Sequence, residues 1–207
     1  ASSAGADAPN PKVKTISLEE LLGGGAVPKE PELRVIGLYS SVEDEKIAEL
    51  TQALLYLNEM NRLLPEGEKK KPVEFYINTY GGSADDMFAL YDVMQVIMEE
   101  TEIHTIGVGK VMSAGTLLLA AGTKGKRKIG KNCRVMIHNV AAGNFGTLPN
   151  LTNELEAIQT LQEDYITAMV ENTKFTRKKL EKLLNEKVNI YLSAEEAVKY
   201  GLADEIM

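Results

Sequence analysis

Two residues of this sequence, Ser113 and His138, have the chemical types needed for nucleophilic catalysis, and each follows or ends a predicted strand. Ser113 lies in the run GKVMSAG at 109–115, where small neighbours leave its hydroxyl approachable just before a predicted helix. Backbone N–H groups at a helix start can bind an oxyanion, and a neutral imidazole can take a proton from a serine. Neither residue is specific alone, because most serines before a helix are caps and most histidines at strand ends are structural. The other histidine, His104, lies inside a predicted strand and is expected to be structural.

Hydrophobic periodicity predicts the elements that position these two side chains. Four short apolar runs are typical of strands, at 33–38, 73–78, 103–108 and 134–138. Four segments with apolar residues three and four apart are typical of helices, at 47–57, 83–100, 116–121 and 155–169. Strands that alternate with helices indicate an α/β fold with a largely parallel sheet. Ligands of such sheets bind beyond the carboxyl ends of the strands, which is where Ser113 and His138 lie.

The two ends of the chain carry different signals. Residues 1–32 are rich in Ala, Ser, Gly and Pro, so we predict a flexible arm there, followed by one domain at 33–207. A disordered tail and a gate or docking arm are both compatible with this composition. Near the other end, SAEE at 193–196 has the pattern of a capping box and predicts the start of a last helix.

Composition and charge exclude several classes of function. The 207 residues, 44% of them hydrophobic and 26% charged, fit one globular domain. The formal net charge of −7 argues against nucleic-acid binding, and no apolar run is long enough to cross a membrane. With no secretory signal and a single cysteine, Cys133, we expect a cytoplasmic protein or one of an organelle matrix or stroma. Metal-ligand spacings, a P-loop and a dinucleotide fingerprint are lacking, so no metal and no cofactor are expected.

Several stretches, in order along about four-fifths of the chain, resemble the proteolytic subunit of Clp protease. These stretches are YINTYGG at 76–82, SAGTLLLAAG at 113–122 with KGKR at 124–127, RVMIH at 134–138, and LSAEEA at 192–197 with YGLAD at 200–204. The resemblance implies a fold of the Clp-peptidase and crotonase type. That fold has stacked β-α units and a protruding handle helix, here at about 149–172.

The resemblance also implies a role for each candidate residue. Ser113 corresponds to the nucleophile, His138 to the general base, and the backbone N–H groups of Gly82 and Ala114 to the oxyanion hole. The implied activity is that of a serine endopeptidase that hydrolyses unfolded polypeptides and short peptides. The implied assembly is a homo-oligomeric barrel of two heptameric rings, a tetradecamer, which a Clp ATPase opens. A paralogous ring subunit is a further partner that the resemblance implies.

The chain departs from the family at the third catalytic position, where Asn189 replaces an aspartate. A triad aspartate fixes the imidazole tautomer and stabilises the imidazolium, and its exchange for asparagine in a serine protease lowers turnover by about 10⁴. We therefore expect impaired activity, unless nearby Glu186 supplies the carboxylate. The family's unfoldase-docking pocket also differs, because apolar positions are here Glu74, Lys128 and Gly130.

Three functions stay open on the sequence. Retention of both Ser113 and His138 favours an active or weakly active peptidase. Asn189 and the altered docking positions favour a ring-forming structural subunit that assembles with a catalytic paralogue. A crotonase-like acyl-CoA enzyme is disfavoured, because such chains are longer and use carboxylates, whereas the spacing of Ser113 and His138 is that of the peptidase.

Overall fold

The computed structural model describes residues 32–143 and 145–207. Arg34–Met207 forms one compact unit. The arm predicted at 1–32 lies, except for Glu32, outside the described residues, so it stays a prediction.

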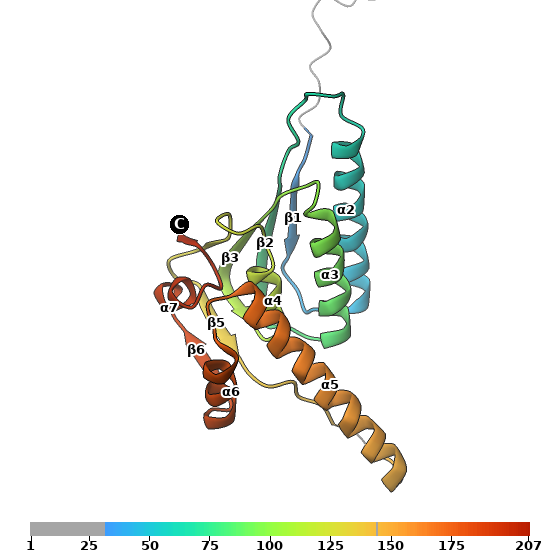
Figure 1. Cartoon of the computed structure of the whole chain (residues 1–207), viewed down its shortest axis with the longest axis vertical. Helices are drawn as coiled ribbons and strands as arrows, with labels where there is room; N and C mark the ends of the chain where they lie inside the picture. Colours follow the sequence, from blue (N-terminus) through green and yellow to red (C-terminus); the bar gives the residue numbers. More distant parts are fainter. Residues whose placement is uncertain (1–31, 144) are drawn as a thin grey trace, which may run out of the picture. The chain divides into compact units, whose positions relative to one another are not determined.

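Strands and helices alternate through most of this unit, as the periodicity predicts (Figure 1). The described elements are β1 (Val35–Leu38), α2 (Asp44–Arg62), β2 (Val73–Thr79), α3 (Ala84–Ile97), β3 (Ile103–Met112), α4 (Ala114–Ala120), β4 (Lys128–Ile129), β5 (Arg134–Ile137), α5 (Leu148–Asn172), α6 (Arg177–Glu186), β6 (Ile190–Leu192), α7 (Ala194–Lys199) and β7 (Glu205–Ile206).

The strands form one largely parallel sheet in the order β1-β2-β3-β4-β7. β5 also pairs in parallel with β3, further along that strand, and β6 pairs antiparallel with β5. Because β3 and β5 run in the same direction, the residues that follow them, Ser113 and His138, emerge at the same edge. The predicted α/β fold with a largely parallel sheet is confirmed.

One apolar core fills the space between the sheet and its helices. Alternate residues of β2 are buried, as in a strand with one covered face, and α2 and α3 lie along that face (Figure 1). Every residue of α4 is buried, so the helix that follows Ser113 is held by packing on all sides. Burial of this apolar surface is the main favourable term in folding.

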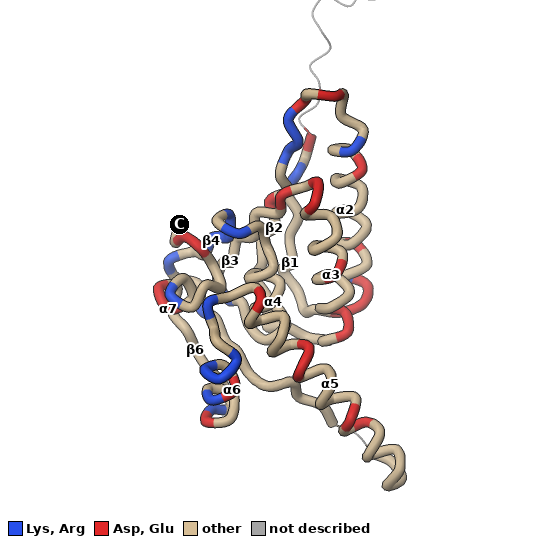
Figure 2. Tube along the Cα trace, viewed as in Figure 1, with Lys and Arg blue, Asp and Glu red and all other residues tan. Residues whose placement is uncertain are grey.

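The long helix α5 is the predicted handle, and its first half extends away from the sheet (Figure 1). Large apolar side chains of that half are exposed at spacings of three and four residues, namely Leu148, Leu151 and Leu155. Figure 2 shows acidic but no basic residues along α5, whereas α6 carries both. The second half of α5 is buried against α4 through residues such as Ile166 and Met169.

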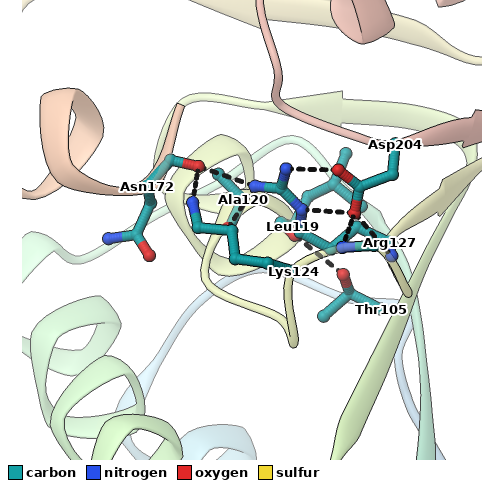
Figure 3. Close-up of polar contacts among 8 residues, drawn as sticks. Thr105, Leu119, Ala120, Lys124, Arg127, Asn172 and Asp204 are labelled. Carbon is teal, nitrogen blue, oxygen red and sulfur yellow. Dashed lines mark hydrogen bonds and ion pairs between the residues drawn. The ribbon is translucent and has the colours of Figure 1, made fainter. Parts of the chain in front are cut away.

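A buried ion pair joins the C-terminal segment to the ends of two helices (Figure 3). The guanidinium of Arg127, 3% exposed, donates to both carboxylate oxygens of Asp204 at 2.6 and 2.8 Å. The same group donates to the carbonyls of Ala120 at 2.9 Å and Asn172 at 2.6 Å, and Lys124 donates to Asn172 as well. Hydrogen bonds from Arg127 hold the pKa of Asp204 at about 2. The KGKR stretch is therefore structural.

Some elements differ from those that the sequence predicts. α6 was not predicted, because its buried face consists only of Leu180 and Leu184 in a lysine-rich segment. β3 continues four residues beyond the predicted end, through Gly109 at φ 66° and a register shift against β2. The predicted capping box is present, with Ser193 and Glu196 bonded reciprocally at the start of α7.

Candidate active site

Ser113 lies at the junction of β3 and α4 in a strained backbone conformation. Its φ of 53° and ψ of −124° make it the single non-glycine residue with positive φ in the described part of the chain. Such a conformation costs roughly 1–3 kcal/mol and persists only where the surroundings fix it. Here the Ser113 N–H donates to the Met136 carbonyl at 2.8 Å, and the Ser113 carbonyl accepts from the N–H and hydroxyl of Thr116 at 2.9 and 2.7 Å. The Ser113 hydroxyl does not cap α4, so it is available for other contacts.

The imidazole of His138 is in direct contact with this hydroxyl. His138 Nε2 lies 2.8 Å from Ser113 Oγ, within the range for a nucleophile and its general base. Both side chains are half-buried, so the pair is partly shielded from water but reachable. With the ring proton on Nδ1, Nε2 is the acceptor and can take the serine proton.

One glycine, Gly81, lies against the turn between β3 and α4 that carries Ser113. Gly81 has φ 97°, and a Cβ there would stand 2.6 Å from Ser113 Cβ and 3.0 Å from the Ala114 nitrogen, so only glycine permits this approach. Thr79 fixes the position of Gly81, because the Thr79 hydroxyl accepts from the Gly81 N–H at 3.0 Å. Within the described residues, the N–H groups of Gly82 and Ala114 have no protein acceptor. Gly82 and Ala114 line the same cavity as Ser113, so their N–H groups are candidates for binding an oxyanion there.

Asn189 lies near His138 but does not bond to it. β5 and β6 pair Ile137 with Ile190, so continued antiparallel pairing would bring His138 opposite Asn189. Asn189 is exposed, and among the hydrogen bonds of the described residues none involves its side chain. The Ser113 hydroxyl is the only partner recorded for the His138 ring in that part of the chain.

The predicted substitute carboxylate, Glu186, is near the histidine without contacting it. Glu186 and His138 line the same small cavity of about 330 Å³ at the end of α6. The Glu186 carboxylate lies 3.7 Å from the ammonium of Lys182, one turn earlier on the exposed side of α6. The geometry in the described residues is therefore a Ser–His pair that no carboxylate touches.

A buried tyrosine that the sequence did not single out supports the turn at Ser113. Tyr165 of α5 lies 3.0 Å through its hydroxyl from Thr116, whose own hydroxyl donates to the Ser113 carbonyl. Since the Thr116 proton is used in that bond, Tyr165 is the donor between the two hydroxyls. Burial raises the pKa of Tyr165 to about 12, so this donor stays protonated. The only signal that the sequence offers for Tyr165 is its position on the buried side of a long helix.

A polar clamp holds the segment that follows His138. The amide of Gln162 accepts from the Val140 N–H at 2.7 Å and donates to the Asn139 side chain at 3.0 Å. Asn139 in turn donates to the Leu184 carbonyl at 3.0 Å. The clamp ties the segment to α5 and α6 and fixes the position of His138 at its start.

Other residues singled out in the sequence lie away from this pair. His104 of β3 lies through Nε2 2.8 Å from Oε2 of Glu102, within hydrogen-bonding distance at the surface. Cys133 is buried, and burial raises the pKa of its thiol to about 11, so it stays a neutral thiol. Within residues 32–143 and 145–207, no cluster of His, Cys, Asp and Glu has the arrangement of a metal site. Among the helices of the same residues, none could span a membrane.

Comparisons with known proteins agree over the whole described unit. The family model for Clp protease matches residues 31–207. The ATP-dependent Clp protease proteolytic subunit of Deinococcus radiodurans is 34% identical over 174 residues, which cover 84% of this chain and 80% of that protein. The ATP-dependent Clp protease proteolytic subunit 1 of Prochlorococcus marinus subsp. pastoris is 34% identical over 181 residues, with 84% and 89% covered. Its namesake from Leifsonia xyli subsp. xyli is 34% identical over 173 residues, with 84% and 82% covered.

Proposed function

The chain belongs to the Clp protease family, and we propose that it is a serine endopeptidase subunit that cleaves unfolded polypeptides and short peptides through Ser113. The predicted family and fold type are thereby confirmed. One observation carries the proposed chemistry, the 2.8 Å contact between His138 Nε2 and Ser113 Oγ. The relatives are named as proteolytic subunits, which supports the same class of activity.

The proposed reaction is an acyl transfer in two halves. Ser113 Oγ attacks the scissile carbonyl carbon while His138 Nε2 takes the hydroxyl proton. The carbonyl oxygen becomes an oxyanion, which the N–H groups of Gly82 and Ala114 stabilise. The protonated His138 then gives its proton to the leaving amine, and the acyl group remains on Ser113. A water molecule, deprotonated by His138, attacks the acyl-enzyme, and return of the proton to Ser113 releases the new carboxyl end.

Asn189 limits the rate of this reaction. The imidazolium that forms on His138 carries a full charge, and an amide offers it no opposite charge. An asparagine can accept a bond from the ring N–H, but it can also turn and favour the wrong tautomer. We expect a slower enzyme than one with a carboxylate at this position, not an inert one.

The subunit works as part of a ring assembly. The exposed apolar stripe at Leu148, Leu151 and Leu155 supports burial of the first half of α5 against other subunits. Two heptameric rings interlocked through these helices are the proposed form. The relatives are ATP-dependent by name, which supports a Clp ATPase as partner. Two of the three predicted docking positions, Glu74 and Lys128, are charged here, and the Lys128 ammonium lies 3.9 Å from the Glu205 carboxylate, so a partner that docks there meets charged groups.

A second candidate is a structural ring subunit that assembles with a catalytic paralogue. The absence of a carboxylate at His138 among the described residues favours it. Retention of the strained Ser113 turn and the His138 contact favours the peptidase, because the strain costs stability and a purely structural subunit has no use for it.

The test is digestion of unfolded casein by the purified, assembled chain alone. We expect fragments that are absent with Ser113→Ala, in an assembly of unchanged size. Intact casein after incubation with a ring of correct size would contradict the peptidase and support the structural subunit. Cleavage by Ser113→Ala at the wild-type rate would exclude Ser113 as the nucleophile.

A further inference from the structure

The cavity beside Ser113 is large enough to hold a long substrate side chain. Its volume is about 780 Å³, and it lies between the first turn of α3, the start of α4 and the middle of α5. Small or apolar side chains form much of its wall: Ala84, Met87, Ala114, Ala157, Ile158 and Leu161. Such a wall can pack against the methylene groups of an extended side chain while the end of that chain stays polar.

The charges that line this cavity are all of one sign. Asp85 of α3 and both Glu154 and Asp164 of α5 line it, and no Lys or Arg does within the described residues. In that part of the chain none of the three carboxylates forms an ion pair with the protein. Figure 2 shows the same imbalance along the whole of α5. The cavity that Ser113 lines therefore carries negative charge without an ion-pair partner among the described residues, on three carboxylates that are exposed to solvent.

The two carboxylates of α5 flank the apolar part of the wall. Glu154, Ile158, Leu161 and Asp164 follow one another at spacings of four, three and three residues, which places them on one face of the helix. Glu154 and Asp164 are about 15 Å apart along the helix axis. A basic side chain that packs near either end of the apolar stretch therefore lies closer to one of the two carboxylates.

We propose that this cavity is the subsite for the substrate residue on the acyl side of the cleaved bond, and that it selects lysine or arginine over apolar residues of equal length. The proposal rests on the function proposed above for Ser113. The apolar wall accepts the stem of either kind of side chain, so the carboxylates decide between them. Opposite unit charges about 4 Å apart in water favour binding about fivefold, and a glutamate in the same place is disfavoured by a similar factor.

The test uses three peptidyl diphenyl phosphonates that differ only in the residue next to phosphorus: lysine, norleucine or glutamate. Such probes lose phenoxide when a serine oxygen attacks phosphorus, and norleucine has the lysine carbon chain without the ammonium. The second-order rate of Ser113 modification is followed by intact mass in the assembled protein. We expect the lysine probe to react at least about fivefold faster than norleucine at low salt, with glutamate slowest. In 1 M salt the preference should shrink, because screening shortens the reach of the charges.

Matched variants show whether the lining carboxylates cause the preference. Glu154→Gln combined with Asp164→Asn removes two lining charges and should bring the lysine and norleucine rates within about twofold of each other. Glu156→Gln combined with Glu171→Gln removes two charges of the same helix that neither line the cavity nor form an ion pair in the described residues, and should leave the preference intact. Equal loss in both double variants would overturn the proposal, because the preference would then come from net charge.

A simple alkyl fluorophosphonate, which carries no peptide side chain, distinguishes a wrong subsite from a wrong proposed function. If it labels Ser113 while the lysine and norleucine probes react at equal rates, the subsite is wrong and the proposed function stands. If it fails to label Ser113 in the assembled protein, both the proposed function and the subsite are wrong.

Discussion

Two polar clusters lie at opposite ends of α4, and only one of them contains a buried charge with its counterion. At its C-terminal end, Arg127 is buried, paired with Asp204, and bonded to the Ala120 carbonyl (Figure 3). At its N-terminal end, His138 touches Ser113, and no carboxylate of the described residues touches the imidazole. A guanidinium is always charged and cannot be buried without a counterion. An imidazole can stay neutral at rest, so the folded protein tolerates Asn189 where the reaction would gain from a carboxylate.

The fold needs the ion pair of Arg127, whereas only the proposed reaction would use a carboxylate at His138. The Arg127 cluster acts in every folded molecule, and its loss is a loss of stability. In the proposed reaction, a carboxylate at His138 would act only while the imidazolium exists, so we expect its absence to lower the rate without destabilising the fold. The two clusters can therefore be broken independently.

The largest effect is expected from the histidine. His138→Ala removes the base from Ser113 and should lower peptide hydrolysis by at least about 10³-fold, because the serine then keeps its proton. The free energy of unfolding in urea should change little, since the ring makes one recorded hydrogen bond in the described structure. Activity within tenfold of wild type would show that His138 is not the base.

A large loss of stability is expected at the other end of α4. Arg127→Met leaves the Asp204 carboxylate without its cation and should lower the free energy of unfolding by about 3 kcal/mol. The measurement is urea denaturation. Arg127→Met combined with Asp204→Leu should recover part of that loss, because no unpaired charge remains. An unchanged unfolding midpoint in the single variant would contradict a structural role for the pair.

The absent carboxylate can be restored by one substitution. Asn189→Asp should raise the rate of peptide hydrolysis between about tenfold and a thousandfold, because it gives the imidazolium an opposite charge. Asn153→Asp adds the same charge at an exposed residue of α5 that does not line the cavity with His138, and it should leave the rate unchanged. A rate that Asn189→Asp does not raise would mean that the imidazole is already held by other contacts.

The smallest effect concerns acid. The pKa of Asp204 is about 2, below its ordinary value of 3.8, because Arg127 stabilises the carboxylate. A lowered pKa contributes stability that is present above the unfolded value and is lost as pH falls through the folded value. Wild-type unfolding midpoints in urea should therefore fall between about pH 4 and pH 2, and Asp204→Asn should flatten part of that slope. An equal slope in both proteins would assign the acid sensitivity to other carboxylates.

The sequence could predict the meeting of Ser113 and His138 but not the contacts that support it. Ser113 and His138 follow apolar runs whose spacing marks them as parallel strands, so their meeting at one sheet edge was predictable. The Tyr165–Thr116 bond joins residues 49 positions apart, and the Gln162–Asn139 bond joins residues 23 apart. Such contacts depend on how α5 packs, which local patterns do not encode. The positive φ of Ser113 was equally hidden, because a serine seldom adopts it without surrounding support.

The central claim is that Ser113 is an activated nucleophile although Asn189 offers no charge to His138. Covalent labelling by an alkyl fluorophosphonate, read by intact mass on the assembled protein, tests this most directly. We predict one label per subunit, none in Ser113→Ala, and labelling slowed by at least about 10³-fold in His138→Ala. Equal labelling of wild type and His138→Ala, or none of the wild type, would contradict the account.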